Sequence, residues 1–103
     1  MSLSEIRTED YPLLNDSFQA APNVLFRLVE DEAVLLYVPA GTYYGLNPTG
    51  ILLWEAIQSK QPLESVADAI LAEYEVERVQ VLADLQALIQ NLLNNGLIIK
   101  ADT

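Results

Sequence analysis

The chain has 103 residues, of which 51% are hydrophobic, and this length and composition predict a single domain with a packed core. It contains no cysteine and no histidine, which excludes disulfide bonds, thiolate nucleophiles and histidine general bases. Fifteen acidic residues against five basic ones give a formal net charge of −10, which would repel nucleic acid. Because no apolar run could span a membrane and no signal pattern opens the chain, we expect a cytoplasmic protein without a membrane partner.

The first 22 residues mix acidic and apolar side chains without a clean period. One interpretation is an N-terminal arm over residues 1–22 that is partly mobile, because chain ends are commonly loose. The other is a segment that packs on the domain or on a partner. The domain itself is predicted to cover residues 23–100.

Three strands are predicted next, over residues 24–29, 33–38 and 42–46. The first strand alternates its side chains, and the second is apolar on both faces, as is typical of a central strand. Short turns at residues 30–32 and 39–41 link them, and short links favour pairing between sequential strands. We therefore predict a three-stranded antiparallel meander with the third strand at an edge.

That edge strand carries no charged residue and is flanked by Gly41 and Gly45. Natural sheet edges are usually protected by charge, proline or a covering element. An unprotected edge is either covered by the chain itself or available to a partner strand. Tyr44 and Leu46 share the face that we expect to meet the helices. Tyr43 faces the other way, as an ordinary surface residue or as a contact residue.

A first helix is predicted from Pro48 to about Gln58, because Asn47 can cap it and proline suits the first helical position. Its inward stripe is predicted to be Gly50, Leu53, Trp54 and Ile57. Apolar residues at helical spacing predict a second helix from about Pro62 to Glu73, with Tyr74 closing its core face.

A third helix is predicted from about Glu77 to Asn95, where Gly96 suits the left-handed position after its end. A short apolar tail over residues 97–99 is compatible with a strand. The whole is an α+β fold, in which a three-stranded antiparallel sheet precedes a three-helix bundle.

The third helix has an unusually wide apolar face, of about 140° at 100° per residue, against about 100° for a core stripe. One margin holds Val81 and Leu88, with Asp84 and Asn91 just outside it, and the other holds Leu93. Either the helix is simply buried on a broad face, or one margin lines a groove.

Catalytic chemistry is poorly supported. No histidine can activate a serine or threonine, and paired carboxylates such as Glu64 and Asp68 lie on the polar side of the second helix. No glycine-rich phosphate motif occurs. We therefore predict a protein that is not an enzyme and that has no catalytic residues, cofactor or metal site.

The block Tyr43-Tyr44-Gly45-Leu46-Asn47-Pro48-Thr49-Gly50, with Trp54 four residues on, resembles the Y-Y-x-L-N-x-T-G-x-x-x-W signature of PqqD-like proteins. These are named after coenzyme PQQ synthesis protein D. The resemblance extends over about residues 22–100 and is most specific in this block. It continues more loosely through Tyr74-Glu75-Val76, Asp84-Leu85 and Asn95-Gly96-Leu97-Ile98.

The resemblance implies a recognition element for ribosomally made, post-translationally modified peptides, most like the free-standing leader binders of lasso-peptide clusters. It also implies that the sheet and the helices form a winged-helix-turn-helix-like fold. Such modules take the leader segment of a precursor peptide as an added strand between the third strand and the third helix. They present it to a modifying enzyme such as a radical-SAM protein or a leader peptidase. The positions that the resemblance implies for binding are Thr42, Tyr43, Tyr44, Gly45 and Leu46.

The wide arc of the third helix supplies the other wall of this expected groove. Its candidate peptide-binding residues are Val81, Asp84, Leu85, Leu88 and Asn91. Asp84 and the net charge of −10 would favour a leader that carries lysine or arginine. Two alternatives stay open: a winged-helix DNA-binding regulator, which the charge opposes, and a small homodimerising scaffold that uses the same edge.

Overall fold

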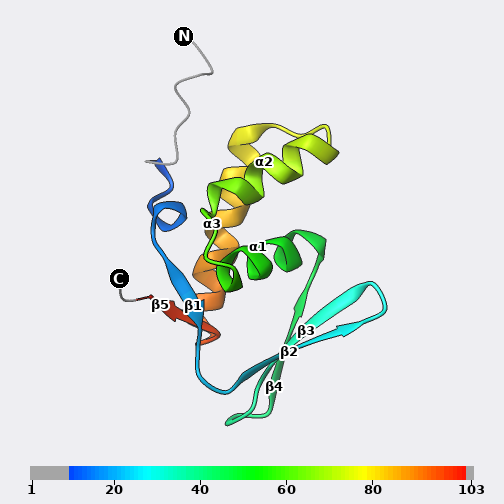
Figure 1. Ribbon diagram of the computed structural model, residues 1–103, viewed down its shortest axis with the longest axis vertical. Coiled ribbons are helices and arrows are strands. Elements are labelled where there is room, and N and C mark those ends of the chain that lie inside the picture. The colour runs from blue at the N-terminus through cyan, green and yellow to red at the C-terminus, as the bar shows by residue number, and fades with distance from the viewer. Residues whose placement is uncertain (1–9, 102–103) are drawn as a thin grey trace.

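The structure of the protein is a computed structural model that describes residues 10–101. Figure 1 shows three helices in its upper half, a three-stranded sheet at the lower right, and a small strand pair beside the lower end of α3. The α+β fold is as predicted. The elements are η3 (Pro12–Asn15), β1 (Phe18–Ala20), β2 (Val24–Val29), β3 (Glu32–Tyr37), β4 (Thr42–Leu46), α1 (Pro48–Gln58), α2 (Glu64–Glu73), α3 (Arg78–Asn94) and β5 (Ile98–Lys100).

The sheet has the strand order β2-β3-β4, and both pairs are antiparallel. The central position of β3 is confirmed, and its residues Ala33 and Leu35 are buried. The middle strand begins one residue earlier than predicted, because Glu32 pairs with Val29 across a two-residue turn. Glu30 takes a positive φ of 60° in that turn, as two-residue hairpins require at a central position.

Helix α1 begins where the sequence indicates. The Asn47 side-chain oxygen accepts a hydrogen bond from the Gly50 N–H at 2.8 Å, and Pro48 occupies the first turn. Gly50 allows close packing on β4, since a Cβ atom there would lie 3.0 Å from Leu46 Cδ2. The predicted inward stripe of α1 is buried throughout: Gly50, Leu53, Trp54 and Ile57.

Helices α2 and α3 complete the core. Tyr74 was predicted to close the core face of α2, but it is 56% exposed. The prediction was wrong because α2 ends at Glu73 and Tyr74 has extended backbone, which takes its side chain off the helical stripe. On α3 the centre of the wide arc is fully buried, whereas Leu88 and Leu93 at its two margins are half-buried.

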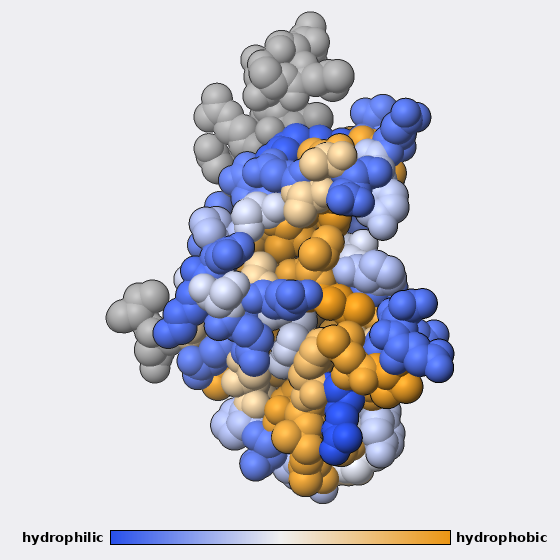
Figure 2. Space-filling model, turned by 45° about the vertical axis from the view of Figure 1, so that its right-hand side comes forward, coloured by the Kyte–Doolittle hydropathy of each residue, from blue (hydrophilic) through white to orange (hydrophobic). Residues whose placement is uncertain are grey.

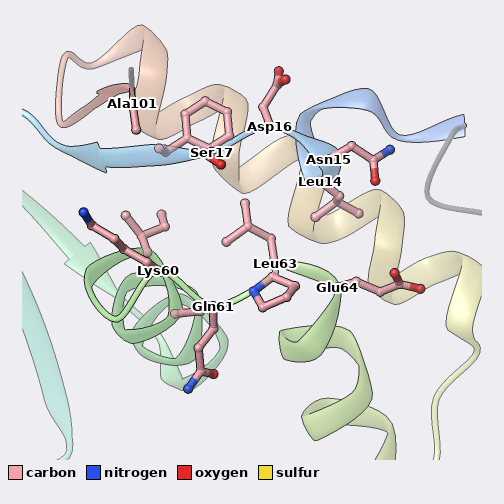
Figure 3. A pocket seen from close by; sticks show the side chains of 13 residues that line it. Leu14, Asn15, Asp16, Ser17, Lys60, Gln61, Leu63, Glu64 and Ala101 are labelled. Atoms are coloured by element: carbon pink, nitrogen blue, oxygen red, sulfur yellow. The ribbon is translucent and has the colours of Figure 1, made fainter. Parts of the chain in front are cut away.

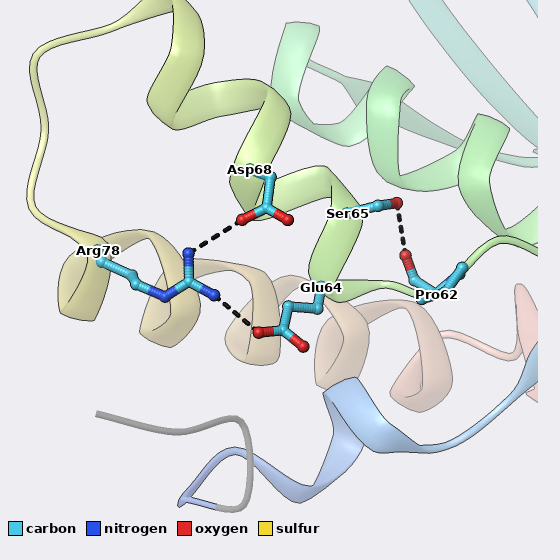
Figure 4. A network of polar contacts seen from close by, with 5 residues as sticks. All are labelled: Pro62, Glu64, Ser65, Asp68 and Arg78. Atoms are coloured by element: carbon cyan, nitrogen blue, oxygen red, sulfur yellow. Dashed lines mark hydrogen bonds and ion pairs between the residues drawn. The ribbon is translucent and has the colours of Figure 1, made fainter. Parts of the chain in front are cut away.

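Arg78 joins the start of α3 to α2. Its guanidinium donates to Glu64 at 2.8 Å and to Asp68 at 3.1 Å, as Figure 4 shows. The Arg78, Glu64 and Asp68 side chains are 33%, 48% and 66% exposed, so solvent screens the two pairs and each adds little stability.

The N-terminal segment is part of the packed structure in so far as it is described. Leu14 and Phe18 are only 4% and 5% exposed, and β1 pairs antiparallel with β5. Of the two interpretations of this segment, residues 10–21 therefore follow the packed one, while residues 1–9 lie outside the described residues. No helix within residues 10–101 is long and apolar enough to cross a membrane.

Replacing Phe18 with alanine should lower the free energy of unfolding by about 3–5 kcal/mol, because a buried aromatic ring would be replaced by a cavity. Urea denaturation measures this change. Gln19 is the matched control, since it is exposed in the same strand and its alanine variant should stay within about 0.5 kcal/mol of the parent. Equal stabilities for the two variants would show that the N-terminal segment does not belong to the core.

Candidate functional site

The open edge of β4 can be described down to its backbone groups. The Val38 N–H donates to the Asn23 carbonyl oxygen at 3.0 Å, just beyond the Val24–Tyr37 pair. Hydrogen-bonded and non-hydrogen-bonded pairs alternate along an antiparallel ladder. Tyr37, Leu35 and Ala33 of β3 must therefore direct their backbone N–H and C=O groups away from β2 and towards β4.

On β4, Thr42 and Tyr44 lie opposite those residues of β3, so their backbone groups are used in the β3–β4 ladder. The intervening residues, Tyr43 and Gly45, direct their N–H and C=O groups to the other side. Within residues 10–101, β4 pairs with β3 alone. Tyr43 and Gly45 therefore offer two donors and two acceptors to an incoming strand.

The side chains of β4 divide between the two faces of the sheet as predicted. Leu46 is buried and Tyr44 is half-buried on the face that meets the helices, where Phe26 of β2 stacks on Trp54 with ring centroids 6.3 Å apart. Tyr43 is 73% exposed on the outer face. An added strand would therefore present alternate side chains to the helices and to the outer face.

Gly45 has no role within the free chain that would require glycine. Its φ is not in the left-handed region, and a Cβ atom there would meet nothing within 4 Å. A glycine inside a strand weakens that strand, and it is often found where another backbone or a ligand approaches closely. Its position on the open edge is therefore consistent with a partner strand.

The two margins of α3 differ in what covers them. The Leu13 N–H donates to the Gln86 side-chain oxygen at 3.1 Å, and the Tyr11 hydroxyl donates to the Val79 carbonyl at 3.4 Å. The N-terminal segment thus covers the margin of α3 that includes Gln86. The opposite margin, which includes Leu88, receives neither of these two hydrogen bonds, and we call it the bare margin.

The predicted residues of α3 take different positions relative to this bare margin. Leu88 is half-buried, and Asp84 and Asn91 are exposed beside it. Val81 and Leu85 are 6% and 0% exposed, so they support the margin from beneath. No described group of His, Cys, Asp or Glu side chains could hold a metal ion.

Two features escaped the sequence analysis. The outward direction of the Tyr43 and Gly45 backbone groups follows from a two-residue β2–β3 turn, whereas the sequence predicts a three-residue turn over residues 30–32. A predicted two-residue turn would have given the hydrogen-bonding pattern of the sheet, and with it this outward direction. The second feature is the cover that the N-terminal segment provides over α3, for which the sequence carries no periodic signal.

The fold is a three-stranded antiparallel sheet with three helices, and β4 is an edge strand of that sheet within the described residues. The family model for coenzyme PQQ synthesis protein D (PqqD) matches residues 32–98, from the start of β3 to the start of β5. The chain belongs to the PqqD family.

Two solved structures are similar over most of the chain. One is TbiB1 in complex with the TbiA(beta) leader peptide, with 33% sequence identity and a TM-score of 0.72, covering 82% of this chain and 99% of that one. The other is a lasso peptide synthetase B1 complexed with the leader peptide, with 30% identity and a TM-score of 0.75, covering 81% and 98%. No curated relative matches the chain.

Proposed function

We propose that this protein is a non-catalytic recognition module that binds the leader segment of a ribosomally made precursor peptide. The leader would add to β4 as a fourth strand, and the module would present it to a modifying enzyme such as a leader peptidase or a radical-SAM protein. The observation that supports this best is the open β4 edge, in a chain similar to two proteins that hold leader peptides. We place this activity in the cytoplasm, where ribosomes release the precursor.

The proposed contacts use two walls of a groove, which are the β4 edge and the bare margin of α3. Backbone hydrogen bonds from Tyr43 and Gly45 would provide affinity, and side-chain pockets would provide specificity for the leader sequence. The inward side chains of the leader would lie between Thr42 or Tyr44 and the bare margin of α3, where Leu88 is the apolar contact. The other proposed site residues contribute to the margin or support the walls: Leu46, Val81, Asp84, Leu85 and Asn91.

Binding should be moderate in strength. Ordering a flexible leader consumes part of the contact free energy, so we expect micromolar to sub-micromolar dissociation constants, or about 8–10 kcal/mol. The net charge of −10 should favour leaders with lysine or arginine.

Fluorescence anisotropy with labelled leader peptides from precursors encoded near this gene tests the proposal. We expect saturable binding of one such leader and none of a scrambled peptide of the same composition. Failure of every neighbouring leader to bind at about 100 µM, well above the expected range, would contradict the proposed function.

One observation also supports the homodimer alternative. The outer face and ends of the sheet expose apolar side chains. Figure 2 shows one face of the molecule, on which apolar residues form a band that continues to the lower end of the molecule. The exposed apolar side chains of the sheet and its turns are Leu25, Leu28, Val29, Val38 and Tyr43. Exposed patches of this kind often mark contact surfaces. Light scattering across protein concentrations would detect a dimer. No structural observation favours the DNA-binding alternative.

A further inference from the structure

A cavity of about 380 Å³ lies between the N-terminal segment and the link from α1 to α2. Figure 3 shows Leu14 and Leu63 pointing towards one another within it, while Gln61 and Glu64 point away. No residue of β2, β3, β4 or α3 lines it. A peptide added to β4 would therefore leave this cavity free.

The walls of the cavity are apolar and its rim is polar. Its walls come from buried side chains of both segments: Leu14, Phe18, Ala56, Ile57 and Leu63. Its volume falls within the range of about 300–1,000 Å³ that is usual for binding sites. This is enough space for a large apolar side chain from another molecule.

Lys60 stands at the rim in a strained backbone conformation. Its φ is 59°, a left-handed value that L-residues adopt at a cost. The Lys60 N–H donates to the Ile57 carbonyl at 3.3 Å, and the Gln61 N–H donates to the Ala56 carbonyl at 3.0 Å. These two bonds form the Schellman motif that closes α1, whose left-handed position glycine normally occupies.

The same motif closes α3, and there the chain does use glycine. Gly96 has a φ of 71°, and its N–H donates to the Leu93 carbonyl at 3.0 Å, while the Leu97 N–H donates to the Leu92 carbonyl at 2.9 Å. The two helix ends thus have one geometry but different residues at the strained position. Asn23 and Glu30 also have a positive φ, so it is the position of Lys60 beside the cavity that distinguishes it.

The charges at the rim leave the Lys60 ammonium group available. Asp16 pairs with Lys100 at 3.6 Å, and Glu64 pairs with Arg78 at 2.8 Å, so both rim carboxylates already have cations. Among residues 10–101, Lys60 makes no ion pair and no side-chain hydrogen bond. A cavity with apolar side chains in its walls and an unpaired cation at its rim complements an apolar side chain next to a carboxylate.

We propose that this cavity is a second docking site, which takes a segment of the modifying enzyme that carries a large aromatic or aliphatic side chain next to an acidic residue. This inference rests on the proposed function, because it assumes that leader and enzyme are held together. The apolar side chain fills the cavity, and the acidic residue pairs with Lys60. The leader on β4 and the enzyme segment then occupy different faces of one module.

Two short blocked peptides probe the site by ¹⁵N–¹H NMR: one with tryptophan followed by glutamate, and one with lysine in place of the glutamate. We expect shifts at the amides of Ser17, Gln61 and Leu63 with the glutamate peptide, and at least about fivefold weaker binding of the lysine peptide. Saturation of β4 with labelled leader should change neither result. Equal affinities of the two peptides, or no shifts up to millimolar peptide, would overturn the proposal.

The variant Lys60→Gly removes both the backbone strain and the ammonium group, and two different measurements report on them. It should raise the melting temperature by about 4 °C or more, because the left-handed strain is removed, and weaken the glutamate peptide at least about fivefold. Glu30→Gly is the matched control, since Glu30 also has a positive φ but lies in the β2–β3 turn. It should stabilise the fold and leave peptide binding unchanged.

Leader binding in these variants distinguishes the two proposals. Lys60→Gly should bind the labelled leader as the parent does, and it should slow processing of the bound precursor by the enzyme. Unchanged glutamate-peptide binding by Lys60→Gly would overturn the docking site while the leader result still supports recognition at β4. Loss of leader binding by the parent protein would instead overturn the proposed function.

Discussion

Replacing Gly45 with proline should weaken leader binding by about 30-fold to 1,000-fold, equivalent to about 2–4 kcal/mol. Proline removes one of the two N–H donors on the open edge, and its ring occupies the space that the incoming strand must enter. The leader carbonyl that loses its partner would be left unsatisfied, which adds about 1–3 kcal/mol to the lost bond. The comparison of anisotropy titrations for parent and variant measures the effect.

The fold should tolerate this substitution. Gly45 directs its N–H outward, and a proline whose missing donor faces solvent is acceptable on an edge strand. The residue before it, Tyr44, is already in a strand, as the residue before proline prefers. Circular dichroism and urea denaturation would verify that the variant stays folded.

Gly45→Ala is the matched control for the missing donor. It keeps the N–H, and its Cβ atom meets nothing within 4 Å in the free chain. We expect its leader affinity to stay within about tenfold of the parent, since only close approach of the partner strand would be affected. A folded Gly45→Pro protein that binds the leader as tightly as Gly45→Ala would refute strand addition at this edge.

Local signals allowed much of the fold to be predicted. The limits of β2, β4 and α1 agree with the sequence-based ones, since Asn47 and Pro48 specify the helix start through a cap and a fixed φ. The inward residues of α1 follow from its period. The prediction for Tyr74 was wrong because the helical period of α2 was extended one residue beyond the end of the helix. There the extended backbone no longer places the side chain on the core-facing side of α2.

The candidate site depends on non-local geometry that a local period does not encode. The covered margin of α3 is set by a bond between Leu13 and Gln86, which are 73 residues apart. Strands β1 and β5 have three residues each, too few to show alternation. The sequence could therefore identify both margins of α3 as candidates, but only the packed N-terminal segment distinguishes them.

This distinction leads to the second large effect. Leu88→Asp should weaken leader binding by about 10-fold to 100-fold, because a carboxylate would replace the apolar contact on the bare margin of α3 and would have to lose its water when the leader binds. Leu93→Asp is the matched control: Leu93 is also a half-buried leucine of α3, but it lies on the margin that the N-terminal segment covers.

The two variants together separate a peptide contact from a loss of stability. Both remove a half-buried leucine, so urea denaturation should give similar destabilisation, of about 1–3 kcal/mol each. If the leader lies along the bare margin, only Leu88→Asp reduces affinity in the fully folded protein, and Leu93→Asp stays within about threefold of the parent. Equal losses of affinity would mean that α3 holds the fold together but does not contact the peptide, and that the β4 edge alone binds the leader.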